Sequence, residues 1–122
     1  MINQINVGII GTGWCGGIRA NACADNPLVD KLYIAESNKE RLQELKKSLK
    51  LESSTDNWNE LIDNKNIDTI IISATPETTH FPMALAALKA GKNVFLEKPI
   101  ATTLKEAEEL IDVSIKNNVK FT

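Results

Sequence analysis

Short apolar runs rich in β-branched residues alternate with segments of helical period along this chain. Valine and isoleucine fit a pleated surface that is at least half-buried, so such runs predict strands. We expect strands over residues 5–10, 31–36, 68–74 and 93–97. The run Thr-Ile-Ile-Ile at residues 69–72 is continuous rather than alternating, which indicates a strand covered on both faces. Residues 119–122 alternate like the start of a further strand.

Segments with apolar residues three or four positions apart lie between these runs and predict helices. Two of them begin with a capping box, in which a hydroxyl side chain and a glutamate three residues later satisfy free backbone N–H groups. These boxes are Ser37 with Glu40 and Thr103 with Glu106. The expected helices cover residues 18–25, the segment with Leu42, Leu45 and Leu49, a short stretch capped by Asn57 and Glu60 and ending near Asn64, the segment from Pro82 to Gly91, and a final helix with Leu104, Ala107, Ile111 and Ile115 on one face.

The repeated order of strand, helix and strand predicts right-handed crossovers between parallel strands. We therefore expect an α/β fold, a doubly wound parallel sheet with helices on both faces, known as the Rossmann fold. A chain of 122 residues suits a single domain with one core.

Composition narrows the functional classes. Fourteen Lys and Arg residues against 16 Asp and Glu give a net charge of −2, which offers no basic surface for nucleic acid or for an anionic membrane. No apolar run is long enough to cross a bilayer, and Met1 to Gln4 lack the layout of a signal peptide, so we expect a cytoplasmic protein. Cys15 and Cys23 match neither a zinc site nor a redox pair, and with one histidine in the chain we expect no metal.

The segment from Gly11 to Gly16 has the pattern GxGxxG, directly after a predicted strand and at the start of a predicted helix. In that context it predicts a dinucleotide-binding loop. Gly11 suits the tight turn, Gly13 lets the backbone approach a pyrophosphate, and Gly16 permits close packing of helix on strand. The backbone N–H groups at the helix start would face the anion, and the helix dipole favours it there.

Glu36 ends the second strand, about 20 residues after Gly16. A carboxylate at that position accepts hydrogen bonds from the adenosine ribose and repels a 2′-phosphate, which favours NAD over NADP. Ser37, Lys39 and Arg41 follow it and leave NADP open, because a hydroxyl and two cations can bind a phosphate.

The second half of the chain resembles a known family. The segments that carry the resemblance are Ser73-Ala74-Thr75-Pro76, then His80, then Ala-Leu-Ala-Ala-Leu-Lys-Ala-Gly-Lys at 84–92, then Val94-Phe95-Leu96-Glu97-Lys98-Pro99. They look like the Gfo/Idh/MocA family of glucose–fructose oxidoreductase and inositol dehydrogenase. The likeness covers essentially the whole chain, in order and at the expected separations.

The resemblance implies NAD(P)-dependent oxidation or reduction of a sugar, sugar nucleotide, cyclitol or related polyol. It places Thr75 and Pro76 beside the adenosine and pyrophosphate, and Glu97 and Lys98 near the nicotinamide ribose and the substrate. It also makes the Lys98-Pro99 bond a candidate for the cis form. The cofactor-binding residues that we expect from motif and resemblance together are Gly11, Thr12, Gly13, Trp14, Cys15, Gly16, Glu36, Ser37, Arg41, Ala74, Thr75, Pro76, His80, Glu97 and Lys98.

Lys98 is the candidate catalytic residue. It follows a predicted strand at the edge where open α/β sheets bind ligands, so its ammonium group can polarise a reacting hydroxyl or carbonyl, or move a proton. For His80 we expect a role in packing or at a helix start rather than as a catalytic base. Trp14 covers the cofactor or packs against a further domain. Both interpretations of Trp14 stay open.

Members of this family continue into a second α/β domain that carries part of the substrate site and the oligomer interface. We therefore expect residues 1–122 to be the cofactor domain of a larger two-domain enzyme, inactive alone and a homo-oligomer at full length. One alternative is a stand-alone dinucleotide-binding or sensing module. A second is an S-adenosylmethionine-dependent methyltransferase, against which the GxGxxG spacing and the Glu97-Lys98-Pro99 segment argue.

Overall fold

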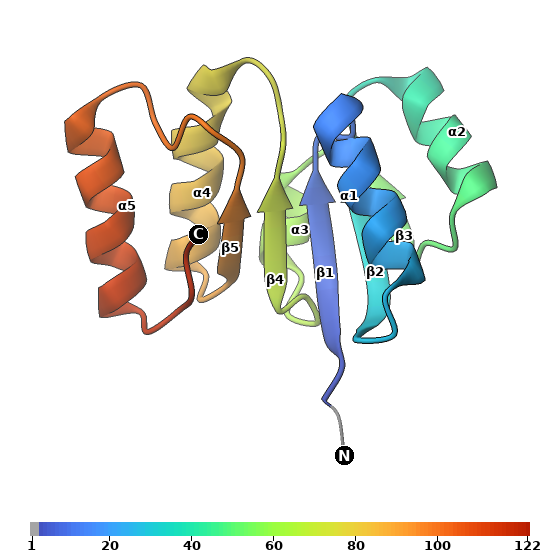
Figure 1. The fold of residues 1–122 in the computed structure, drawn as a ribbon, viewed down its shortest axis with the longest axis horizontal. Coiled ribbons are helices and arrows are strands. Elements are labelled where there is room, and N and C mark those ends of the chain that lie inside the picture. The colour runs from blue at the N-terminus through green and yellow to red at the C-terminus, as the bar shows by residue number, and fades with distance from the viewer. Residues whose placement is uncertain (1–2) are drawn as a thin grey trace.

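The computed structural model describes residues 3–122, and in them five parallel strands form one sheet in the order β3-β2-β1-β4-β5 (Figure 1). The strands are β1 (Ile5–Ile10), β2 (Val29–Ala35), β3 (Ser53–Thr55), β4 (Thr69–Ile72) and β5 (Asn93–Leu96). The strand order reverses between β1 and β4, which makes this the switch point of a doubly wound sheet. The expected fold class is confirmed. Met1 and Ile2, which belong to the segment expected not to be a signal peptide, lie outside the described residues.

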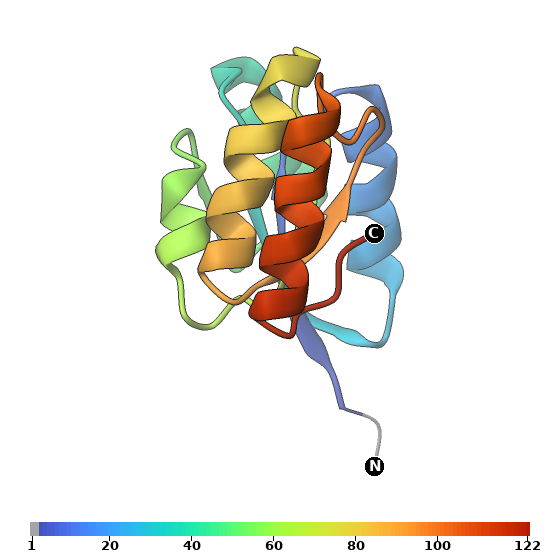
Figure 2. The ribbon, with the colours of Figure 1, turned by 90° about the vertical axis from the view of Figure 1, so that its left-hand side faces the viewer.

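Helices cover both faces of the sheet (Figures 1 and 2). They are α1 (Trp14–Asp25), α2 (Lys39–Ser48), α3 (Asn59–Asp63), α4 (His80–Lys89) and α5 (Leu104–Lys116), with a 3₁₀ turn η1 at Glu77–Thr79. One apolar cluster joins β1 and β2 to α1 and α2 through residues such as Ile9, Ala20 and Leu45. A larger one joins the sheet to α3, α4 and α5 through Ile70, Leu88 and Leu110. Alternate residues of the strands point to opposite faces and supply both clusters.

The predicted cap at Ser37 is wrong. Glu36 Oε1 accepts the backbone N–H of Asn38 at 2.9 Å, so the chain turns one residue further before α2 begins. Asn38 then becomes the cap, and its side-chain oxygen accepts the N–H of Arg41. The cap at Thr103 is confirmed, because its hydroxyl accepts the N–H of Glu106.

The apolar face predicted for α5 is largely exposed. Leu104 is 76% exposed and Ile115 is 72% exposed, while Leu110 and Ser114 point inward. α5 packs on α4, and Leu110 belongs to the same apolar cluster as Ala84 and Ala87 of that helix. Packing on α4 therefore covers the side of α5 with Leu110, and the stripe with Leu104 and Ile115 faces outward.

The last residues lie beside β5, as expected for the start of a strand. The N–H of Val94 donates to Lys120 O at 2.9 Å, and that of Leu96 donates to Thr122 O at 2.7 Å. Val94 and Phe121 form a parallel bridge. No helix within residues 3–122 has the length and apolar character needed to span a membrane.

Candidate dinucleotide-binding site

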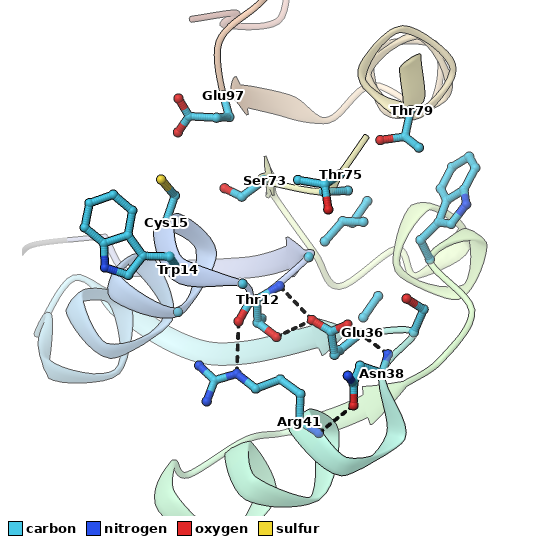
Figure 3. Close-up of a pocket in the computed structure, with 18 of the residues that line it drawn as sticks. Thr12, Trp14, Cys15, Glu36, Asn38, Arg41, Ser73, Thr75, Thr79 and Glu97 are labelled. Carbon is cyan, nitrogen blue, oxygen red and sulfur yellow. Dashed lines mark hydrogen bonds between the residues drawn. The ribbon is translucent and has the colours of Figure 1, made fainter. Parts of the chain in front are cut away.

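The carboxyl ends of β1, β2, β4 and β5 open into a groove of about 1010 Å³ (Figure 3). It lies at the switch point of the sheet, which is where open α/β folds bind their ligands. Most of the expected cofactor-binding residues line it, but Gly16 and Pro76 are not among the residues that line it. The sequence did not indicate that Asn38, Trp58, Ser73 and Thr79 would join them.

The glycine loop is packed too closely for side chains at two of its positions. Gly11 has a φ of +84°, and a Cβ there would lie 2.6 Å from Ala74 Cα. A Cβ on Gly16 would lie 2.0 Å from the Gly11 carbonyl oxygen. Gly13 differs, since a Cβ there would meet nothing within 4 Å. Its backbone therefore borders open space at the start of α1.

The start of α1 is suited to an anion. Gly13 is the N-cap and supplies no side-chain hydrogen bond, and the first turn holds no acidic residue. The first N–H groups of a helix lack partners within the helix, and the helix dipole makes that end positive. This end of α1 therefore presents backbone donors and partial positive charge to the groove.

Glu36 holds the loop to the end of β2. Its Oε2 accepts the backbone N–H of Thr12 at 2.8 Å and also the Thr12 hydroxyl, while Oε1 accepts the N–H of Asn38 (Figure 3). Burial alone would raise the pKa of Glu36, but the hydrogen bonds from Thr12 and Asn38, with the nearby Arg41 cation, hold it below its ordinary value. Glu36 is therefore an ionised carboxylate at the groove wall, already engaged by Thr12.

Arg41 lies across the same loop from α2. Its Nε donates to Thr12 O at 3.0 Å, and its guanidinium pairs with Glu44 at 3.2 Å. A Cβ on Gly17 would lie 2.6 Å from Arg41 Nη2, so the small residue at 17 makes room for this arginine. Arg41 and the exposed Ser37 both line the groove next to Glu36.

His80 connects the two loops at the other end of the groove. It is the first residue of α4 and is 2% exposed, which agrees with the expected structural role. Its Nδ1 lies 2.7 Å from Pro99 O and its Nε2 lies 2.9 Å from Ala74 O. One imidazole therefore joins the loop after β4 to the loop after β5. The Lys98-Pro99 bond is cis, as expected, and the Thr75-Pro76 bond, for which no cis form was predicted, is also cis.

The loop after β5 presents Glu97 and Lys98 to the groove. Lys98 is exposed, and its backbone N–H donates to Glu97 Oε1 at 3.1 Å. Glu97 also pairs with Arg19 of α1 at 2.6 Å, and this hydrogen-bonded cation holds the pKa of Glu97 below its ordinary value. No feature of the sequence pointed to Arg19. Trp14 lines the groove and is 84% exposed.

Comparisons with known proteins identify the family of this chain. The chain is 34% identical to levoglucosan dehydrogenase from Pseudarthrobacter phenanthrenivorans over 97% of its length, which is 32% of that relative. It is 31% identical to myo-inositol 2-dehydrogenase from Thermotoga maritima over 94% of its length, which is 34% of that relative. The chain thus spans about a third of the length of these relatives.

Solved structures give the same result. Apo scyllo-inositol dehydrogenase from Lactobacillus casei matches with a TM-score of 0.90 at 28% identity, over 100% of this chain and 36% of that one. The family described as "Oxidoreductase family, NAD-binding Rossmann fold" matches residues 5–122. The chain therefore belongs to the Gfo/Idh/MocA oxidoreductase family and represents its NAD-binding Rossmann fold.

Proposed function

We propose that residues 1–122 are the cofactor domain of an oxidoreductase that acts on a sugar, sugar nucleotide, cyclitol or related polyol by hydride transfer. The observation that carries the proposal is the groove at the switch point, with a glycine loop at one end and Lys98 at the other. Relatives named levoglucosan dehydrogenase and myo-inositol 2-dehydrogenase support the class of substrate.

The residues of the groove fit a dinucleotide. Gly11 and Gly16 pack directly against neighbouring backbone. Gly13, at the N-terminus of α1, borders open space instead. A pyrophosphate suits this position, because it accepts the N–H groups and is attracted by the helix dipole. When bound, the dinucleotide supplies the hydride acceptor or donor, and the protein positions it.

Lys98 is the proposed catalytic residue of this chain. It is exposed at the carboxyl end of β5 and lines the groove, so its ammonium group is free to donate a hydrogen bond to a substrate oxygen. Such a bond polarises a carbonyl or assists loss of a hydroxyl proton. His80 is engaged with two backbone carbonyls, which argues against a role for it as the base. The rest of the substrate site and the interface of a homo-oligomer would lie in a further domain.

NAD is the proposed cofactor, ahead of NADP. The carboxylate of Glu36 is kept ionised by Thr12 and Asn38, so it repels a 2′-phosphate at the end of β2. Ser37 and Arg41 are the competing features, but the Arg41 guanidinium already binds Thr12 O and Glu44. The charges beside Glu36 therefore favour the free 2′-hydroxyl of NAD over the 2′-phosphate of NADP.

Calorimetric titration of the 122-residue chain with NAD, NADP and S-adenosylmethionine tests these proposals. We expect NAD to bind more tightly than NADP, and Glu36→Gln to remove most of that preference. Glu108→Gln on the exposed side of α5 is the matched control and should keep it. Binding of S-adenosylmethionine in place of any nicotinamide dinucleotide would contradict the proposed function.

A further inference from the structure

The partner of Glu97 reaches it from α1. The Arg19 guanidinium pairs with the Glu97 carboxylate at 2.6 Å and donates to Ser73 Oγ at 3.1 Å. It also lies over the Phe95 ring, 5.1 Å from the ring centre, in the geometry of a cation–π contact. Three contacts, at the ends of β4 and β5, therefore fix the guanidinium behind Glu97.

Glu97 itself lines the groove at the end opposite the β2 wall (Figure 3). In a doubly wound fold each half of the sheet holds one mononucleotide of the dinucleotide. The glycine loop and Glu36 form the adenosine half, so the ends of β4 and β5 face the nicotinamide half. This step rests on the proposed function.

The oxidised nicotinamide ring carries a positive charge that the reduced ring lacks. A carboxylate beside the ring therefore attracts NAD⁺ more than NADH, and a cation bound to that carboxylate cancels much of the attraction. The exposed ammonium group of Lys98, which follows Glu97 in the chain, also acts on its carboxylate. We infer that the Arg19–Glu97 ion pair sets the preference of this domain between oxidised and reduced dinucleotide.

Arg19 is thus a positioning residue that acts through Glu97. Its effect should appear in the ratio of the two dissociation constants, Kd(NADH)/Kd(NAD⁺), rather than in either one alone. If Arg19 had a purely structural role, its loss would weaken the binding of both dinucleotides equally and leave that ratio unchanged. The ratio is also insensitive to a fraction of unfolded protein, which binds neither ligand.

The test measures both constants by calorimetry on the 122-residue chain and its variants. We expect Arg19→Gln to raise the ratio about fivefold, as for loss of one nearby charge in a partly solvated site. Glu97→Gln should lower the ratio by a similar factor, and the double variant should return it toward the wild-type value. Arg19→Lys keeps the cation and should keep the ratio.

Lys116→Gln is the matched control, because it removes one exposed positive charge from the last turn of α5. It should leave the ratio unchanged. A ratio unaffected by Arg19→Gln, with both dinucleotides still bound, overturns the inference and leaves the proposed function standing. A wild-type chain that binds neither dinucleotide overturns both.

Discussion

Different interactions hold the loops in place at the two ends of the groove. At the glycine loop, backbone approaches backbone so closely that a Cβ on Gly16 would lie 2.0 Å from Gly11 O. Beyond β4 and β5, polar side chains hold the loops instead. His80 lies between two carbonyls, and Arg19 pairs with Glu97. Glu36 and Arg41 also bond Thr12 in the glycine loop, but only this end has positions, Gly11 and Gly16, where no side chain fits.

This difference predicts how each end responds to change. Tightly packed backbone has no room to relax, so an added methyl group strains the whole turn. Removing one partner of a polar contact at a partly exposed site costs less stability, because water replaces the missing partner. Substitutions at Gly11 and Gly16 should therefore be severe, and the effects of substitutions among the polar side chains should increase with burial.

Gly16→Ala should have the largest effect. The new Cβ would overlap the Gly11 carbonyl, and we expect a loss of about 3 kcal/mol or more in the free energy of unfolding. Urea unfolding measures it. Gly13→Ala is the control, because its Cβ enters open space and should cost less than about 1 kcal/mol while weakening dinucleotide binding. Equal stability of the two variants would refute the steric account of the loop.

His80→Ala should come next. It removes a buried ring and the imidazole N–H that lies between the Ala74 and Pro99 carbonyls, which costs about 2–3 kcal/mol in the free energy of unfolding. Lys89→Ala on the same helix is exposed and should change stability by less than about 0.5 kcal/mol. If both variants unfold at the same urea concentration, His80 does not hold the loops.

Glu36→Gln should alter the response to acid. The folded-state pKa of Glu36 lies below its ordinary value of 4.5. The unfolded chain therefore takes up this proton first, and the stability that ionised Glu36 contributes is lost as the pH falls through the folded-state pKa. Urea unfolding between neutral and strongly acidic pH should show a shallower loss for Glu36→Gln than for wild type. Glu108→Gln should follow the wild-type curve, and an identical slope in all three would exclude this role.

Gly91→Ala should have the smallest effect and test a position far from the groove. Gly91 has a φ of +78° after α4, with open space around it, so an added methyl group costs about 1 kcal/mol of backbone strain. Gly91→Asn tolerates this conformation better and should cost less. Both should keep the wild-type affinity for NAD in calorimetry. A weaker affinity would show that the far end of the sheet influences the groove.

The strands and the glycine loop were predictable from the chain because their signals are local. The apolar runs at 5–10 and 93–97 form strands close to their expected bounds, and the residues from 119 onward pair with β5. The three-residue β3 was missed, since Ser53 to Thr55 carries no apolar signal and forms a strand through its pairing with β2.

Errors arose where several local choices are nearly equal in energy. Both Ser37 and Asn38 are good caps, and the hydrogen bond from the Asn38 N–H to Glu36 selects Asn38. On α5, two faces carry apolar residues, and packing against α4 buries the one with Leu110. Within the site, Arg19 was missed because its position after the glycine loop carries no signal for its partner.

Neighbouring residues alone were enough for the order of elements, the parallel sheet and the turn at Gly11, because apolar period and glycine content act over a few positions. The partners of Glu36, His80 and Glu97 come from other elements of the fold. A polar side chain has many acceptable partners, and the sequence does not distinguish among them. Packing of α1 and α4 on the sheet selects one partner for each polar side chain. It does so because it brings donor and acceptor within hydrogen-bond distance and removes competing water.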